Sequence, residues 1–177
     1  MRVLVAYASK HGSTQGIADR IGEDLRQDGH QVDVRPAGQA KHAEEYDAFV
    51  VGSAAYAMHW MKDASSFVKK NKQTLAHKPL WLFSSGPLGT DKVDKEGNDV
   101  VEASYPKEAK EFAFLNPRDH HVFFGALHFD ELGFTGRMLK KMPATRDSIP
   151  EGDFRDWDDI DRWAHDIGRQ LTAGPAT

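Results

Sequence analysis

The sequence predicts a three-layer α/β sandwich around a five-stranded parallel sheet. Five short runs are apolar throughout, which is typical of parallel strands that are covered on both faces. Segments with apolar residues at helical spacing lie between these runs. The chain has 177 residues, enough to bury a sizeable core, and we expect a single domain over residues 1–177.

The first half of the chain supplies three of these strands. Residues 2–7 and 47–52 are β-rich runs, and a strand around Val32 and Val34 lies between them in sequence. A helix follows the first strand and ends at Asp28-Gly29, where glycine stops the helical pattern. Its apolar positions recur every four residues: Ile17, Ile21 and Leu25.

The second half supplies two strands and three helices. We expect strands at 80–83 and 122–124, each preceded by a helix, at 62–75 and at 104–115. The last helix has an acidic first turn, which suits the positive end of a helix dipole. Its apolar face is Ile160, Trp163, Ala164, Ile167 and Leu171. Between the fifth strand and this helix, residues 127–156 form an insertion far longer than the usual connection of about 2–6 residues.

Composition excludes several classes of protein. The chain has 27 acidic and 23 basic residues and a net charge of −4, whereas a general nucleic-acid binder is normally basic. It contains no cysteine, so disulfides, thiolate metal sites and iron–sulfur clusters are excluded. The adjacent His120 and His121 point to opposite faces of a strand and cannot share a metal ion. No run approaches the roughly 20 apolar residues of a membrane span, so we expect a cytoplasmic protein without integral membrane contact.

The loop after the first strand has the composition of a phosphate site. It reads Ser9, Lys10, His11, Gly12, Ser13 and Thr14, followed by the first helix. Gly12 permits a tight turn, and the free N–H groups of a helix start converge on an anion. The loop has neither the Gly-Lys-Ser/Thr ending of a Walker loop nor a dinucleotide-binding Gly-x-Gly-x-x-Gly. The alternative is a strand-to-helix turn with good capping residues.

This loop resembles the phosphate loop of flavodoxins, which has the form S/T-x-T-G-x-T and binds the phosphate of FMN. Ser9, Gly12 and Thr14 match that form, and His11 stands in the place of its middle Thr. The resemblance implies FMN as the cofactor. The departure at His11 removes one hydroxyl contact, so we expect this residue to contribute through its backbone N–H.

Two further loops are expected at the same edge of the sheet. In flavodoxins such loops enclose the flavin ring and bond its pyrimidine edge through backbone groups. The small residues that end the third strand would let a flat ring approach, and Tyr56 is a better stacking candidate than Trp60. The predicted ring-binding residues are Ser53, Ala54, Ala55 and Tyr56 of the second loop, and Ser85, Gly86, Pro87, Leu88 and Gly89 of the third.

The whole chain is similar to the flavodoxin-domain branch that contains the menaquinone-dependent protoporphyrinogen oxidases. Segments 7–14, 50–56 and 66–70 carry this similarity, together with Asp156-Trp157 before the last helix. The resemblance implies an FMN-dependent oxidoreductase. Two alternatives stay open: an electron-transfer flavodoxin without its own small-molecule substrate, and a domain that has kept the fold but lost the flavin. The mild net charge, the basic run at 137–141 and the insertion favour the enzyme.

The insertion carries a segment with two interpretations. Residues 135–142 have the pattern of a short helix with Met and Leu on one face and Arg and Lys elsewhere. The more common outcome for such a helix is to pack its apolar face on the domain. The sharper hypothesis is that residues 133–142 dock a redox partner, a quinone or a protein, or lie on a membrane surface as a peripheral contact.

Overall fold

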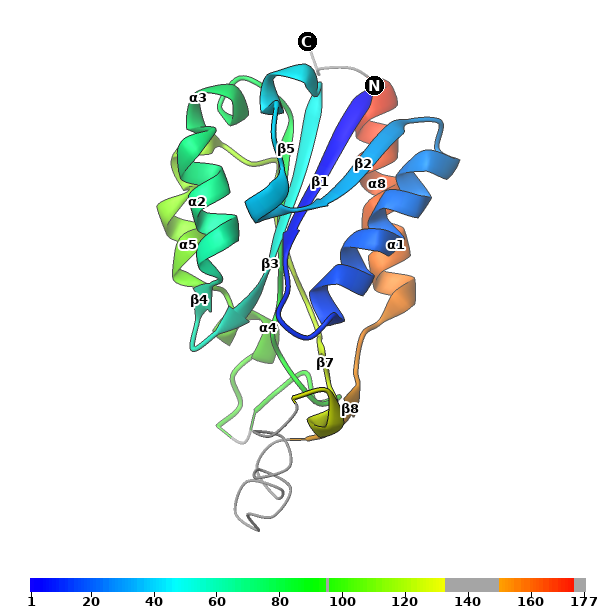
Figure 1. The fold of residues 1–177 in the computed structure, drawn as a ribbon. Coiled ribbons are helices and arrows are strands. Elements are labelled where there is room, and N and C mark those ends of the chain that lie inside the picture. The colour runs from blue at the N-terminus through cyan, green and yellow to red at the C-terminus, as the bar shows by residue number, and fades with distance from the viewer. Residues whose placement is uncertain (95, 133–149, 174–177) are drawn as a thin grey trace.

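A parallel β-sheet covered by helices on both faces forms the centre of the molecule (Figure 1). The computed structural model describes residues 1–94, 96–132 and 150–173. The strand order is β2-β1-β3-β5-β6, and neighbouring strands run parallel. The predicted α/β sandwich with a five-stranded parallel sheet is therefore confirmed, with one short antiparallel strand, β4, added beside β3.

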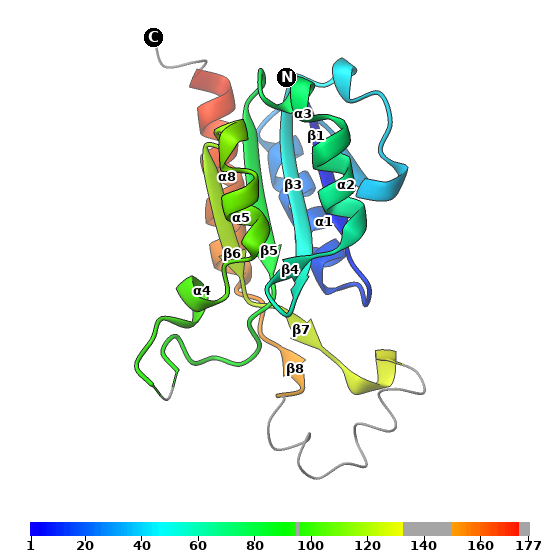
Figure 2. The ribbon, with the colours of Figure 1, turned by 90° about the vertical axis from the view of Figure 1, so that its left-hand side faces the viewer.

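The strands follow the predicted order along the chain. A separate two-stranded antiparallel sheet, formed by β7 and β8, lies beyond the carboxyl edge of the main sheet (Figures 1 and 2). The strands are β1 (Arg2–Ala8), β2 (Gln31–Pro36), β3 (Ala48–Tyr56), β4 (His59–Trp60), β5 (Leu80–Ser85), β6 (Asp119–Phe123), β7 (Ala126–Leu127) and β8 (Gly152–Asp153).

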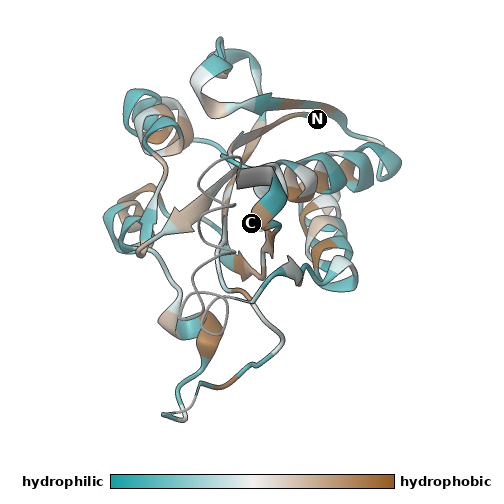
Figure 3. Ribbon diagram, turned by 60° about the horizontal axis from the view of Figure 1, so that its bottom comes forward, coloured by the Kyte–Doolittle hydropathy of each residue, from teal (hydrophilic) through white to brown (hydrophobic). Residues whose placement is uncertain are grey.

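Helices pack on both sides of the sheet and divide the core into two halves. Helices α1 (Ser13–Gln27) and α8 (Trp157–Ala173) cover one face, where Ile17, Ile21 and Ile160 are fully buried. The other face carries α2 (Lys62–Lys70), α3 (Lys72–Leu75) and α5 (Lys107–Glu111). The helices on both faces are largely hydrophilic, with hydrophobic residues at intervals along them (Figure 3), and the buried ones belong to the two halves of the core. The remaining helical segments are α4 (Val100–Ala103) and the 3₁₀ turns Ala37–Gln39, Ala43–Glu45, Ala113–Leu115 and Phe129–Leu132.

Some element boundaries differ from the prediction. The helix expected at 62–75 breaks at Asn71, whose side-chain amide donates to the carbonyl of Phe67 at 2.8 Å. The helix expected at 104–115 is α5 followed by a 3₁₀ turn. The fifth strand begins at Asp119 rather than Val122, because His120 and His121 find polar partners on opposite faces of the sheet and so fit a strand. Their opposite orientation is confirmed.

The topology brings three loops together at one edge of the sheet. Strands β1, β3 and β5 are neighbours, so the loops after them meet at their carboxyl ends. From β1 the chain adds β2 on one side of the sheet and then β3 on the other. Ligands of open α/β sheets bind at such a switch in strand order. The predicted helix at 135–142 lies outside the described residues. Within the part of the chain that the structure describes, no helix is both long and apolar enough to cross a membrane.

Candidate functional site

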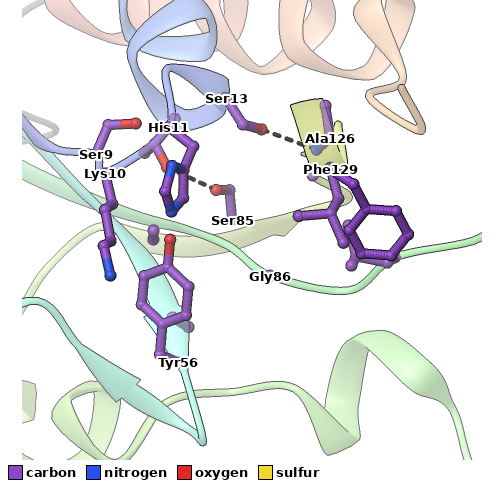
Figure 4. A pocket seen from close by; sticks show the side chains of 15 residues that line it. Ser9, Lys10, His11, Ser13, Tyr56, Ser85, Gly86, Ala126 and Phe129 are labelled. Atoms are coloured by element: carbon purple, nitrogen blue, oxygen red, sulfur yellow. Dashed lines mark hydrogen bonds between the residues drawn. The ribbon is translucent and has the colours of Figure 1, made fainter. Parts of the chain in front are cut away.

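A pocket of about 480 Å³ opens at the carboxyl edge of the sheet (Figure 4). This volume lies in the range of about 300–1,000 Å³ that is usual for small-molecule sites. The loop after β1, the last residues of β3, and the end of β5 with the loop after it form three of its sides, and the segment after β6 forms the fourth. The lining residues are Ser9, Lys10, His11, Ser13, Thr14, Ala54, Ala55, Tyr56, Ser85, Gly86, Leu88, Gly125, Ala126, Leu127 and Phe129.

One end of the pocket is built to hold an anion. Gly12 caps the start of α1 with φ of 84°, a left-handed conformation that glycine adopts without strain. As glycine it has no side chain to accept from the first N–H groups of the helix, which have no partners inside the helix. These N–H groups and the positive end of the helix dipole therefore face the pocket, and both favour a phosphate.

Three of the four hydroxyl groups around this end accept a hydrogen bond from the protein and keep their own proton for a ligand. Ser9 Oγ accepts from the N–H of Gly12 at 3.1 Å, and Ser13 Oγ accepts from the N–H of Ala126 at 2.8 Å. Thr14 Oγ1 and Ser85 Oγ lie 2.8 Å apart and share one bond, so one of the two O–H groups is left over. Three O–H donors thus remain for an anionic group.

The charge of the pocket is positive. Lys10 lines it, and none of the described residues that line it is Asp or Glu. The structure places no carboxylate within salt-bridge distance of Lys10 among the described residues. A site with this electrostatic character favours a ligand that carries negative charge.

Tyr56 provides the aromatic face of the pocket. It is the last residue of β3, its ring is half-exposed, and it rises from the strand end toward Lys10 and His11 (Figure 4). Partial burial raises the pKa of the Tyr56 phenol above its ordinary value, so the ring stays neutral over the physiological range. A flat ligand in the pocket can stack on this ring.

Most of the predicted site residues line the pocket, and a few serve the scaffold instead. Ser53 is fully buried, and its Oγ donates to the carbonyl of Ala54 and accepts from the N–H of Met61 at 2.9 Å. Three other predicted residues are not part of the pocket lining: Gly12, Pro87 and Gly89. Trp60, the weaker stacking candidate, is buried and turned away, and its Nε1 donates to Ser84 Oγ at 2.8 Å.

The small residues expected to lie at the end of the third strand and in the loop after it are all part of β3, which extends to Tyr56, and Gly52 among them has another role. A Cβ at Gly52 would lie 2.0 Å from the Phe83 ring. The glycine therefore makes room for an aromatic side chain of the neighbouring strand, not for a ligand.

Sequence reasoning missed the fourth wall of the pocket, which is Gly125, Ala126, Leu127 and Phe129. Phe129 is buried, and its N–H donates to Glu151 Oε1 at 2.9 Å, so the wall is tied to the segment that returns from the insertion. These residues follow β6 directly. Because the carboxyl end of the fifth parallel strand lies at the same edge as the others, their position in sequence was the available signal.

The fold and the pocket together define a class: an α/β protein with a cofactor site for a phosphate-bearing, flat ligand. Comparison with known proteins gives the family. Residues 4–148 match the family described as "Flavodoxin domain". The chain belongs to the flavodoxin domain family, and membership of that family implies FMN as the cofactor.

Individual relatives agree with this family. Protoporphyrinogen IX dehydrogenase [quinone] of Escherichia coli (strain K12) is 25% identical over 182 residues, which cover 99% of this chain and 98% of that protein. Flavodoxin of Nitratidesulfovibrio vulgaris (strain DSM 19637 / Miyazaki F) is 41% identical over 39 residues, 22% of this chain and 26% of that one. The solved structure of a short-chain flavodoxin associated with a bacterial microcompartment shares the fold, with a TM-score of 0.61, 15% identity and coverage of 98% and 99% of the two chains.

The residues present fit FMN. The free N–H groups at the start of α1 and three spare O–H donors suit its phosphate, and the cationic lining suits its charge. The half-exposed ring of Tyr56 and the apolar wall opposite suit a flat ring system.

Proposed function

We propose that the protein is an FMN-dependent oxidoreductase that resembles quinone-dependent protoporphyrinogen oxidase. The observation that carries this proposal is the extent of similarity to the Escherichia coli dehydrogenase, which covers 99% of the chain. That similarity includes the segment after β6, from which one wall of the pocket is built. Bound FMN supplies the redox chemistry, and the protein supplies binding, orientation and access.

Each loop has a distinct role in this proposal. The first loop, residues 9–14, holds the phosphate through backbone N–H groups and the hydroxyls of Ser9, Ser13 and Thr14. The end of β3 presents Tyr56 to one face of the ring. The third loop, residues 85–89, bonds the polar edge of the ring through its backbone. The apolar wall around Phe129 excludes water from the opposite side of the pocket.

The role of Tyr56 is tested by the fluorescence of bound FMN. A stacked tyrosine quenches flavin emission, so Tyr56→Ala is expected to raise the emission of bound FMN and to weaken binding a few-fold, since aromatic contacts contribute about 0.5–1.5 kcal/mol. Tyr56→Phe keeps the ring and is the matched control. Bound FMN that is fully fluorescent in the parent protein would contradict stacking.

The activity is tested with protoporphyrinogen IX as donor and a menaquinone analogue as acceptor. We expect purified, FMN-loaded protein to oxidise the porphyrinogen and reduce the quinone. The competing function is electron transfer between proteins, which the local similarity to Nitratidesulfovibrio flavodoxin favours. A protein that exchanges electrons rapidly with a flavodoxin reductase but does not oxidise the porphyrinogen would belong to that second class.

The insertion is proposed to dock the redox partner through residues 133–142, in a protein that works in the cytoplasm with peripheral membrane contact. Removal of these residues is expected to preserve the fold and FMN affinity, because surface loops can be shortened at small cost, and to slow electron delivery to the acceptor. Melting temperature, FMN affinity and quinone reduction are compared with the parent. A variant that no longer folds would mean that this segment belongs to the core.

A further inference from the structure

The turn that follows Tyr56 has an unfavourable backbone conformation. Ala57 and Met58 connect β3 to β4 as a two-residue hairpin, with Tyr56 paired to His59. Their φ angles are 49° and 62°, in the left-handed region. Residues with a Cβ rarely adopt that region, and two-residue hairpins of this kind prefer Asn-Gly. The local sequence does not favour this turn, so contacts elsewhere must hold it.

Those contacts come from the start of α5. Glu108 is buried, with 8% of its surface exposed, and its Oε2 accepts from the N–H of Trp60 at 3.1 Å. Its Oε1 lies 3.3 Å from His59 Nδ1. The N–H of the preceding Lys107 donates to the carbonyl of Met58 at 2.9 Å. One turn of α5 thus binds the carbonyl of Met58 within the turn and both residues of β4.

Two serines fix the far side of the same hairpin. Ser53 Oγ accepts from the N–H of Met61, and Ser84 Oγ accepts from Trp60 Nε1. These bonds set the positions of Trp60 and Met61. The carboxylate of Glu108 instead contacts the side chain of His59, which pairs with Tyr56, and accepts from the backbone N–H of Trp60. A buried carboxylate is costly unless it accepts hydrogen bonds, and here the hairpin supplies them.

We propose that Glu108 is a positioning residue for the cofactor site. It holds the Ala57-Met58 turn in its left-handed conformation and thereby fixes Tyr56 at the pocket. Glu108 does not line the pocket, so it acts through the hairpin. The proposal deepens, and rests on, the proposed stacking of Tyr56 on the flavin ring.

The first test compares Glu108→Ala with variants that separate position from fold. We expect Glu108→Ala to reduce FMN affinity by no more than the few-fold expected for Tyr56→Ala and to release part of the quenching by Tyr56. Glu108→Gln keeps a carbonyl acceptor for the N–H of Trp60 and is expected to retain most of both. Glu111→Ala removes an exposed carboxylate of the same helix that pairs with Lys69 at 2.9 Å, and is expected to change neither.

The decisive test is rescue by a turn that needs no external support. Ala57→Asn combined with Met58→Gly installs the residues that this hairpin prefers. In the Glu108→Ala background the pair is expected to restore FMN affinity and quenching. Loss of affinity that the Asn-Gly turn does not restore, or no loss at all in Glu108→Ala, would overturn the proposal.

Amide hydrogen exchange in the FMN-free protein separates this proposal from the proposed function. Glu108→Ala is expected to speed exchange at Trp60 and Lys107 by tenfold or more, and the Asn-Gly turn is expected to slow it again. Unchanged exchange in Glu108→Ala would refute the role of Glu108, whatever the flavin does. If the Asn-Gly turn slows amide exchange again but bound FMN keeps its full fluorescence in every variant, only the stacking of Tyr56 would be refuted.

Discussion

The replacement of Thr14 by Val tests whether the first loop binds the phosphate of FMN. Thr14 lies in the first turn of α1 and is 1% exposed, and its Oγ1 lies 2.8 Å from Ser85 Oγ. Valine has nearly the same shape, so the change removes a hydroxyl without creating a cavity. A hydrogen bond to a charged group contributes about 1.5–3 kcal/mol. The Kd for FMN is therefore expected to rise by about 10- to 100-fold.

Riboflavin, which lacks the phosphate, isolates the effect. We expect Thr14→Val to change riboflavin affinity by only a few-fold, because the remaining cost is the Ser85 hydroxyl left with one partner fewer. Thr14→Ser keeps the hydroxyl and is expected to bind FMN more tightly than the valine variant. Both affinities are measured by fluorescence titration or calorimetry. An equal loss for FMN and riboflavin, or equal affinities in the parent protein, would refute phosphate binding by this loop.

Three further predictions concern stability and the scaffold of the site. Gly12→Ala is expected to lower the free energy of unfolding by about 1 kcal/mol and to weaken FMN binding, because alanine is strained at a φ of 84° even though no atom lies within 4 Å of the added Cβ. Gly29→Ala is the control: its φ is 88°, its surroundings are equally open, and it should lose stability without losing FMN affinity. Burial lowers the pKa of His120 from 6.5 to about 4, so the folded state binds this proton more weakly than the unfolded state, and stability is lost as pH falls from about 6.5 toward 4. Urea unfolding should show a contribution of about 2 kcal/mol from this residue between pH 7 and pH 5, and its replacement by Gln should remove it. Gly52→Ala is expected to destabilise the protein by about 1–3 kcal/mol or more, since its Cβ would overlap the ring of Phe83, and a melting temperature equal to that of the parent would contradict this packing argument.

Much of the fold could be predicted because its signals are local. The apolar runs of β1, β3 and β5 mark strands that are buried on both faces, and the spacing of Ile17, Ile21 and Leu25 marks the helix between the first two strands. Boundaries were less accurate where partly buried polar residues have partners on other elements. His120 and His121 interrupt the apolar pattern of β6, yet each finds a partner on another element.

The cofactor site was predicted in part for the same reason. Gly12 and the hydroxyl residues beside it mark the first loop in the sequence, and its position at the edge of the sheet follows from the strand order. The roles of Ser53 and Trp60 could not be predicted, because each side chain is committed to a partner that only folding brings near. Nor could the turn at Ala57 and Met58, since its support comes from α5 about fifty residues further along the chain.

The sequence by itself determined the α/β class, the order of the parallel strands along the chain and the composition of the loop that we expect to bind a phosphate. These follow from hydrophobic periodicity and from backbone preferences, which act over a few residues. The tertiary structure decided which residues face the pocket, that the wall around Phe129 completes it, and that Glu108 contacts the hairpin that follows Tyr56. The physical reason is that hydrogen-bond partners and packed surfaces are chosen among all elements at once. A side chain at a strand end can therefore face a ligand or the scaffold with the same local sequence around it.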